Sequence, residues 1–285
     1  MYIGAHTSAS GGLFKAVQRA LDDGCESLQV FVKNNNRWAQ RDWREDEIEK
    51  FISAYEGSGL KGLTAHTSYL INLCSNNPET VKKSKDALED ELNRCAQLKI
   101  PYLVMHPGSH MKEGEAKGLQ TIVKNLEEVY GREQNDAWKD VMLLFENTAG
   151  QGTNLGYKLE HLSTLFAGLT QPERFGVCFD TCHALAAGYD FRDEESYEAF
   201  WNEFDTKVGI DRIKIFHMND SKQDLGSRVD RHENIGKGKL GEAPFKLLVN
   251  DPRFKEIPAV LETAPDDKGS FSHDVNVLKS FREKE

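Results

Sequence analysis

Short apolar runs alternate with longer amphipathic stretches along almost the whole chain. A short apolar run bounded by turn signals is typical of a buried strand, and apolar positions three or four residues apart are typical of a helix. The runs predict strands near residues 2–7, 27–33, 62–67, 102–106, 141–146, 175–180, 213–218 and 258–263. The amphipathic stretches predict helices near residues 12–22, 44–56, 78–98, 115–130, 158–168, 194–207, 242–250 and 271–283. The pattern therefore predicts eight strands and eight helices in alternation.

Eight successive strand–helix units favour a closed (β/α)8 TIM-type barrel with parallel strands. Such a barrel typically takes ~250 residues, and this chain has 285. A doubly wound open sheet is the alternative, but it usually concentrates its chemistry at one switch point. Because no linker or low-complexity segment divides the chain, residues 1–285 are predicted to form a single domain. The longest irregular segment runs from Asp220 to Gly241, and a loop of that length is usually functional or disordered.

Most of the predicted strands end on a histidine or a carboxylate. The side chains at these ends, or in the long loop after residue 217, are His66, His106, Glu146, Asp180, His183, His217, Asp230, His232 and Glu262. In a barrel all strands end on the same face, so these groups would converge on one site. One histidine at a strand end is commonly a hydrogen-bonded structural residue. Nine such residues at one topological position indicate a metal centre instead.

The chemistry of this set restricts the metal. Five histidines and four carboxylates without a thiolate suit zinc or manganese in a catalytic site. Nine ligands are too many for one ion, and bridging carboxylates would let them hold two or three. Several ions in one cleft are typical of phosphoryl chemistry.

Two further histidines and two loops could support the site or contact its substrate. His6 on the first strand and His110 in HPGSH are predicted to support the ligands or touch the substrate, whereas His161 and His273 are expected to be packing or surface residues. The loops KNNNRWAQ and HTSYLINL follow the second and third strands. Amides and arginine can contact bases and phosphates, tryptophan can stack, and apolar side chains can unstack a base step. The candidate contacts with nucleic acid are Asn36, Arg37, Trp38, Tyr69 and Leu70. The alternatives are a polar loop with a packing tryptophan and a lid on the barrel.

Charge taken alone argues against a nucleic-acid partner. The formal net charge is −10 and the isoelectric point is near 5.5, whereas phosphate binding usually leaves a basic footprint. Bound divalent cations would invert the local field in their cleft, so the argument weakens if the metal centre is real.

Cysteine content and hydropathy bear on location. The five cysteines form no C-x-x-C pair, which favours a reduced intracellular compartment. No apolar stretch approaches the ~20 residues of a membrane span, and we find no signal peptide. A cytoplasmic protein is expected, associated with the nucleoid in a bacterium or nuclear in a eukaryote, and not secreted.

Seven motifs together resemble the endonuclease IV family, zinc-dependent apurinic/apyrimidinic endonucleases (AP endonuclease family 2) of base-excision repair built on a TIM-type barrel. The motifs are HTSYLINL (66–73), HPGSH (106–110), ENTAGQG (146–152), CFDTCHALAAGYD (178–190), HMNDSK (217–222), SRVDRHENIGKG (227–238) and LET (261–263). They span most of the chain and are jointly specific.

The resemblance implies three zinc ions, with manganese an alternative at one site, and catalytic roles for Glu146 and Glu262. It divides the ligands into a first set of His66, His106 and Glu146, a second set of Glu146, Asp180, His217 and Glu262, and a third set of His183, Asp230 and His232. Glu146 would bridge the first two ions.

The resemblance also implies the reaction. A duplex with an abasic site would be bent, the abasic nucleotide flipped out, and the phosphodiester on its 5′ side hydrolysed to a 3′-hydroxyl and a 5′-deoxyribose phosphate. Activities of 3′-phosphodiesterase and 3′-phosphatase are implied too, and a monomer is expected. Tyr69 and Leu70 would fill the gap in the duplex. The family typically carries an arginine where this chain has Asn36, so either Arg37 enters the base stack through a shifted loop or the wedge is weaker.

Two other functions compete with this interpretation. A metal-dependent sugar isomerase or epimerase on a related barrel would use similar strand ends, but it usually needs one ion and fewer ligands. A non-catalytic protein that binds damaged DNA would hold zinc in closed four-ligand sites, more often with cysteine.

Overall fold

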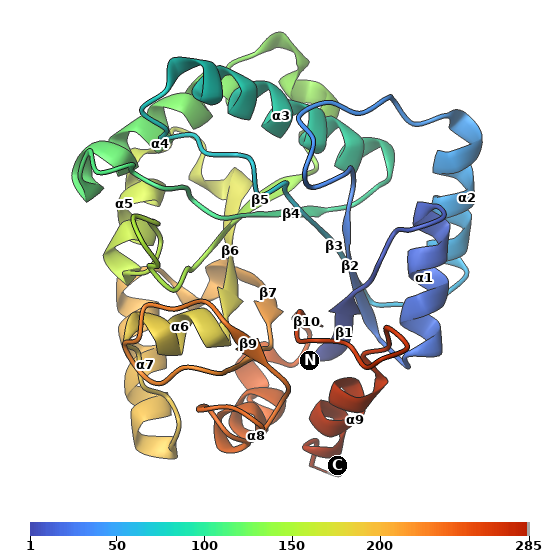
Figure 1. Cartoon of the computed structure of the whole chain (residues 1–285), viewed down its shortest axis with the longest axis vertical. Helices are drawn as coiled ribbons and strands as arrows, with labels where there is room; N and C mark the ends of the chain where they lie inside the picture. The colour runs from blue at the N-terminus through green and yellow to red at the C-terminus, as the bar shows by residue number, and fades with distance from the viewer. Residues whose placement is uncertain (284–285) are drawn as a thin grey trace.

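The computed structural model describes residues 1–283, the side chains of residues 133–135 excepted. Within these residues a closed parallel barrel forms the centre, with the strands in the order β1-β10-β7-β6-β5-β4-β3-β2 around the ring (Figure 1). Its strands are β1 (Tyr2–His6), β2 (Ser27–Phe31), β3 (Gly62–His66), β4 (Tyr102–Met105), β5 (Met142–Glu146), β6 (Phe175–Asp180), β7 (Ile213–His217) and β10 (Pro258–Leu261). Pairing of β1 with both β2 and β10 closes the ring. The predicted (β/α)8 barrel is confirmed, with strands up to two residues shorter at their ends.

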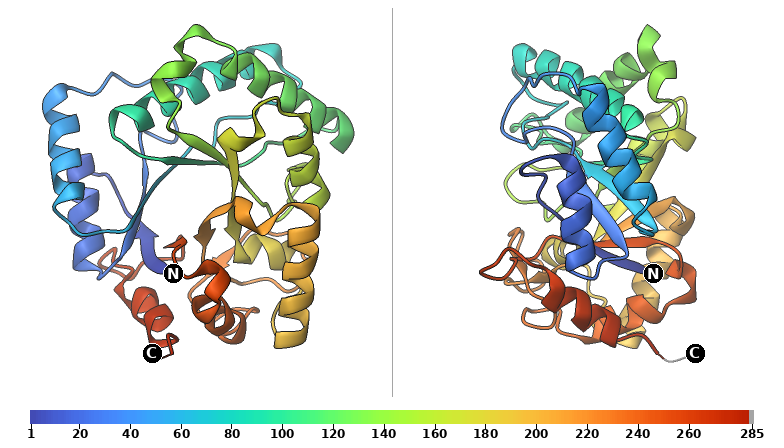
Figure 2. Two further views of the ribbon diagram at one scale, coloured as in Figure 1. Left: turned by 180° about the vertical axis from the view of Figure 1, so that it is seen from behind. Right: turned by 90° about the vertical axis from the view of Figure 1, so that its right-hand side faces the viewer.

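Helices surround the strands on the outside of the barrel (Figure 1). They are α1 (Leu13–Asp22), α2 (Glu45–Glu56), α3 (Pro78–Gln97), α4 (Glu115–Tyr130), α5 (Leu159–Gly168), α6 (Thr181–Ala187), α7 (Glu194–Lys207), α8 (Ala243–Asn250) and α9 (Ser272–Ser280). Short 3-10 helices are η1 (Glu133–Trp138), η2 (Pro172–Arg174), η3 (Ile210–Arg212) and η4 (Pro252–Phe254). The side view in Figure 2 shows long loops gathered at one end of the barrel, with the N-terminus toward the other.

Helix α6 is absent from the prediction. It follows β6 with no loop, and Asp180 caps it by accepting the backbone N–H of His183 at 2.7 Å. Nearly all of its residues are buried, so the sequence TCHALAA lacks the polar face that reveals a helix by its periodicity. The consequence is that one turn of helix fixes the position of His183 relative to Asp180.

Side chains along each strand point alternately outward and inward, so the barrel has an outer core against the helices and a separate interior cluster. Phe145, Phe179 and Phe216 point outward to the helices and belong to the large core between strands and helices. A separate cluster fills the barrel interior and consists of Val104, Leu144, Cys178, Ile215 and Val260. Since side chains two apart on a strand share a face, the next inward positions are His106, Glu146, Asp180, His217 and Glu262. The apolar interior is therefore capped by a layer of potential metal ligands at the carboxyl ends of the strands.

The long segment after β7 is more ordered than predicted. Two short antiparallel strands, β8 (Asp220–Ser221) and β9 (His232–Glu233), pair Ser221 with His232. The buried Asp220 carboxylate accepts the backbone N–H groups of Gly238 and Leu240, both at 2.9 Å. This pairing folds the segment back toward the barrel.

No helix within residues 1–283 is long and apolar enough to cross a membrane. Residues 284 and 285 of the predicted domain lie outside the described part of the chain, so one domain over residues 1–285 stays a prediction.

Candidate metal centre

All nine predicted ligands gather at the carboxyl ends of the barrel strands. Their ligand atoms form compact groups, within which all atoms lie within 4.8 Å of one another. Three of these groups are His66, His106 and Glu146; Glu146, Asp180, His217 and Glu262; and His183, Asp230 and His232. These are the three sets that the sequence resemblance implies.

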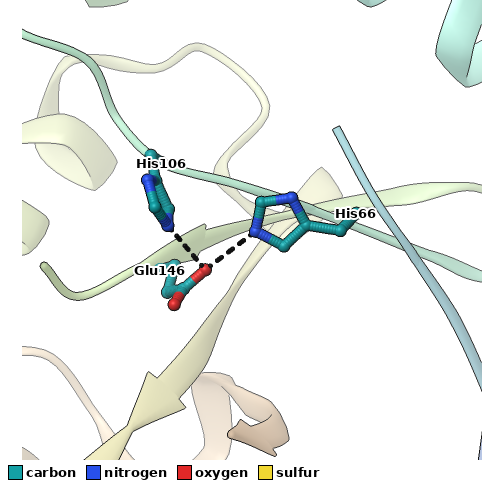
Figure 3. A group of neighbouring side chains, drawn as sticks. All are labelled: His66, His106 and Glu146. Carbon is teal, nitrogen blue, oxygen red and sulfur yellow. Dashed lines mark hydrogen bonds and ion pairs between the residues drawn. The ribbon is translucent and has the colours of Figure 1, made fainter. Parts of the chain in front are cut away.

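The first set centres on one carboxylate oxygen. Oε2 of Glu146 lies 3.1 Å from Nε2 of His66 and 3.2 Å from Nε2 of His106. Both imidazoles point toward this carboxylate (Figure 3). Ligands at 2.0–2.1 Å from a tetrahedral zinc ion lie roughly 3.3 Å apart. The spacing of these atoms therefore fits a shared ion.

Glu146 also belongs to the second set. Its Oε1 lies 3.2 Å from Nδ1 of His217. The same oxygen lies 3.2 Å from Nδ1 of His183, which is the ring nitrogen opposite the one that faces Asp230. The two oxygens of one fully buried carboxylate thus address different groups of histidines. That is the geometry a bridging ligand needs.

The second and third sets have the same close spacing. Nδ1 of His217 lies 3.3 Å from Oε2 of Glu262, and Nε2 of His183 and of His232 lie 3.2 and 3.4 Å from the Asp230 carboxylate. Yet Nε2 of His183 and Nε2 of His232 are buried and make no hydrogen bond of acceptable geometry. Buried polar atoms are normally satisfied, so these two nitrogens fit a metal ion as their partner.

The far side of each of four imidazoles is hydrogen-bonded. Outer partners of this kind fix which ring nitrogen carries the proton and orient a metal-binding histidine. The contacts are His66 Nδ1 to Thr67 O at 2.8 Å, His183 Nδ1 to Asn147 O at 2.9 Å, His232 Nδ1 to Glu262 O at 3.2 Å and His217 Nε2 to Gln29 Oε1 at 2.9 Å. In each ring the other nitrogen is left to face the cluster.

The charges in the cluster hold the carboxylates of Glu146 and Glu262 in the ionised form. Burial would raise the pKa of Glu146, but the charges of His217 and His106 outweigh burial and hold that pKa well below its ordinary value. Burial would likewise raise the pKa of Glu262, which His217 and the hydrogen bond from His6 lower instead. Burial would lower the pKa of His183, but carboxylates led by Asp180 raise it. These ionised carboxylates are ready to ligate, and metal binding would release the extra proton of the His183 imidazole.

Three amides that the sequence reasoning did not select hold the ligands in place. Asn219 donates to Oδ2 of Asp180 at 2.7 Å and accepts the backbone N–H of Glu262 at 2.8 Å. Asn147 accepts the backbone N–H of Asp180 at 2.8 Å. Two signals in the sequence could have revealed these amides. Both asparagines lie one or two residues after a candidate ligand, and Gln29 is the one polar side chain within the apolar run LQVF.

The two histidines predicted to support the site differ in position. Nδ1 of His6 lies 3.1 Å from Oε1 of Glu262 and 3.0 Å from Nε2 of Gln29, at the edge of the cluster. Burial lowers the pKa of His6, which favours the neutral ring. His110 lies in the loop after β4, where its Nδ1 accepts the backbone N–H of Gly114 at 3.1 Å. The structure therefore brings His6 to the candidate metal ligands, while the contacts of His110 stabilise the loop.

The histidines expected to lie outside the site do so. His161 is buried, and its Nδ1 accepts the backbone N–H of Gly156 at 3.1 Å, so it is a packing residue. His273 is exposed at the start of α9.

The two loops lie beside the cluster. Tyr69 is 59% exposed, and its ring centroid lies 5.5 Å from that of His66 and 6.1 Å from that of His106, while Leu70 is half-buried. Asn36 and Arg37 are exposed, and Trp38 packs half-buried against the core. The loops thus offer exposed aromatic and polar groups next to the candidate metal centre.

A cavity of about 980 Å³ opens beside the cluster. Its wall includes Glu262 and His232 from the cluster, and Ser8, Asn34 and Pro265 from the loops after β1, β2 and β10. The centre is therefore accessible, as a catalytic metal site must be.

The fold and the site define the class of protein, which is a xylose isomerase-like TIM barrel with a candidate metal centre. A family model described as "Xylose isomerase-like TIM barrel" matches residues 17–281. The chain is 44% identical over 265 residues to "Probable endonuclease 4" of Geobacter sp. (strain M21), covering 93% of each protein. It aligns with endonuclease IV from Thermus thermophilus at a TM-score of 0.84 and 34% identity, covering 99% of this chain and 98% of that one. The chain belongs to the endonuclease IV family and is a nuclease.

The same fold occurs in sugar epimerases. A D-tagatose 3-epimerase-like protein aligns at a TM-score of 0.70 with 16% identity, covering 99% of this chain and 97% of that one. At this identity the likeness concerns the fold alone. The family resemblance predicted from the motifs is confirmed, and the isomerase alternative loses its support.

Proposed function

We propose that this protein hydrolyses the phosphodiester bond on the 5′ side of abasic sites in duplex DNA, giving a 3′-hydroxyl and a 5′-deoxyribose phosphate. The observation that carries the proposal is the position of Glu146, whose Oε2 faces His66 and His106 of the first set while its Oε1 faces His217 of the second set. A shared carboxylate suits several adjacent ions, and several adjacent ions are the usual device for phosphodiester hydrolysis.

The donor set suits three zinc ions, with manganese an alternative at one site. His66, His106 and Glu146 would hold the first, and Glu146, Asp180, His217 and Glu262 the second. His183, Asp230 and His232 would hold the third. When bound, the ions would supply Lewis-acid activation of the phosphoryl group and of water.

The residues of the chain would set the reaction geometry. We assign catalytic roles to Glu146 and Glu262, because both carboxylates lie in the cluster and one oxygen of each lies close to Nδ1 of His217. Hydrogen bonds to Oε1 of Glu262 from Gln29 at 2.7 Å, and from His6 when its Nδ1 carries the proton, would keep this carboxylate fixed while substrate binds. Such preorganisation lowers the reorganisation needed to reach the transition state.

Recognition of DNA would fall to the two loops. Tyr69 and Leu70 would enter the gap left by a flipped abasic nucleotide, since they lie next to the first ligand set. Asn36, Arg37 and Trp38 would contact the duplex nearby, with Arg37 rather than Asn36 supplying a cation. Bending and flipping would bring the phosphate to the cluster.

Trimming of blocked 3′ ends, as a phosphodiesterase or phosphatase, would use the same centre, because the phosphoryl group at a 3′ terminus presents the same oxygens. We also propose that the chain acts as a monomer, since the three sets of candidate ligands are complete within one chain and need no residue from a second copy.

The test is incision of a duplex with one tetrahydrofuran abasic analogue by the zinc-replete protein, paired with elemental analysis. We expect a cut on the 5′ side of the analogue, about three ions per chain, and no cut in intact duplex. Absence of incision by metal-replete protein would refute the proposal. A single ion per chain together with epimerisation of a ketose would instead support the isomerase.

A further inference from the structure

A buried polar group lies beneath the two loops that flank the candidate metal centre. Lys33 follows β2, Ser68 follows β3, and Glu91 belongs to α3, and these side chains are 5%, 3% and 0% exposed. Buried charges are costly unless they are paired and hydrogen-bonded. None of the three belongs to the ligand sets, so their burial needs another explanation.

Glu91 connects α3 to the turn that carries Tyr69. Its two carboxylate oxygens accept the backbone N–H of Ser68 at 3.1 and 3.3 Å. Tyr69 is the next residue, so the Glu91 carboxylate fixes the backbone immediately before it.

Lys33 connects the same carboxylate to the other loop. Its Nζ lies 3.2 Å from Oε1 of Glu91 and donates to the backbone oxygen of Trp38 at 3.3 Å. A second charge on α3, Asp90, also accepts from Lys33 at 3.3 Å. Lys33 therefore ties segment 33–41 to Glu91, the carboxylate that also holds the Tyr69 turn.

Ser68 joins the two loops directly. Its Oγ donates to the backbone oxygen of Asn35 at 2.8 Å and accepts the backbone N–H of Leu70 at 3.3 Å. Arg94 on α3 adds a further anchor by donating to the backbone oxygens of Gln40 and Arg41 at 3.0 and 3.1 Å. Each loop is thus tied to the same helix and to the other loop.

We propose that Lys33, Ser68 and Glu91 are positioning residues that fix segments 33–41 and 67–71 to one another, so that both loops meet damaged DNA as a single surface. The inference rests on the proposed function, because it assigns both loops to the same substrate. It explains why charged groups are retained beneath loops that do not themselves ligate metal.

The central variant is Ser68→Ala, which removes the bonds of Oγ to Asn35 and Leu70 and keeps the backbone N–H that Glu91 accepts. The matched control is Ser84→Ala: Ser84 is buried on α3, and its Oγ accepts the backbone N–H of Asn72 at 2.9 Å. That bond supports the loop after β3 but does not touch segment 33–41. Glu91→Gln is a second variant that keeps the size of the side chain.

The first measurement is amide hydrogen exchange of the full-length, zinc-replete protein without DNA. Ser68→Ala should speed exchange in both segments, whereas Ser84→Ala should speed it only near residue 72. Exchange that rises in residues 67–71 alone in the Ser68 variant would overturn the linkage. This result does not depend on whether the protein cuts abasic DNA, so failure of the linkage and failure of the proposed function are separable.

The second measurement is a double-mutant cycle on binding to abasic-analogue duplex. In the wild-type background, the effects of Arg37→Ala and Tyr69→Ala should be non-additive, and in the Ser68→Ala background they should add. Ser68→Ala alone should raise Kd for abasic duplex about tenfold with kcat changed less, as expected for loss of one buried hydrogen bond. Equal coupling between Arg37→Ala and Tyr69→Ala in both backgrounds would show that these residues give only general structural support. An equal loss of affinity for abasic and intact duplex in Ser68→Ala would show the same.

Discussion

Oε1 of Gln29 lies 2.9 Å from Nε2 of His217, although the two residues are 188 positions apart in the chain. The amide oxygen can only accept, so Nε2 of His217 carries the proton and Nδ1 faces the carboxylates of Glu146 and Glu262. The amide nitrogen of the same side chain donates to Oε1 of Glu262 at 2.7 Å. One buried amide therefore orients two members of the second ligand set.

Replacing this amide should weaken metal binding at the second set. In Gln29→Leu, His217 can adopt either tautomer and Glu262 loses a donor, so we expect zinc affinity to fall by about 10–100-fold, as is typical for loss of an outer-shell partner. Competition with a chromogenic chelator measures this directly. Gln18→Leu, at an exposed position of α1, is the control. Unchanged zinc retention in the Gln29 variant would mean that the amide is a packing residue.

Replacing the shared carboxylate should strongly reduce incision. Glu146→Gln removes the charge that faces four histidines and keeps the size of the side chain. We expect single-turnover incision of abasic duplex to fall by more than about a hundredfold, beyond the cost of an outer-shell change, with bound zinc reduced. Glu49→Gln, at an exposed position on α2, should cut normally. Incision that survives in Glu146→Gln would show that the assignment of the bridge is wrong.

The loop at residues 34–38 decides how the duplex is distorted. If Arg37 enters the base stack, Arg37→Ala should weaken binding to abasic duplex by about 1–3 kcal/mol, the usual range for a stacked side chain, and should weaken binding to intact duplex less. Titration of both duplexes by fluorescence anisotropy measures the difference, and Asn36→Arg should restore part of it. Lys61→Ala, just before β3, controls for net charge. An equal loss on both duplexes would identify Arg37 as a phosphate contact.

Protonation of Glu91 should make stability depend on pH. Burial raises the pKa of Glu91 from 4.5 to about 7, against the opposing charge of Lys33. Because the folded protein binds this proton more tightly than the unfolded chain, the contribution is fully present below about pH 4.5 and is lost as pH rises through about 7.

Glu91→Gln has no such proton to lose. Its stability relative to that of the wild type should therefore rise between pH 5 and pH 8. We expect a rise on the order of 3 kcal/mol or less in free energy of unfolding, seen as a higher Tm relative to the wild type. Thermal unfolding of both proteins across this range, with saturating zinc, makes the comparison. A constant difference in Tm would show that Glu91 stays ionised throughout.

Much of the fold and of the candidate site follows from local sequence pattern. Apolar runs predicted the strands because a strand buried on both faces has few polar positions, and the barrel followed from their number. His106, Glu146 and His217 were recognisable because each comes directly after such a run. Helix α6 was missed because a fully buried helix shows no polar face.

The sequence by itself indicated which residues are candidates to bind metal, since the residue types and their positions at strand ends are local properties. Only the tertiary structure decided that the oxygens of Glu146 face separate groups of histidines, that Gln29 orients His217, and that Ser68 joins two loops. These contacts connect residues far apart in the chain, and their distances depend on the register and closure of the barrel. A pattern along the chain carries no information about such distances, because they are set by how side chains from several strands pack together.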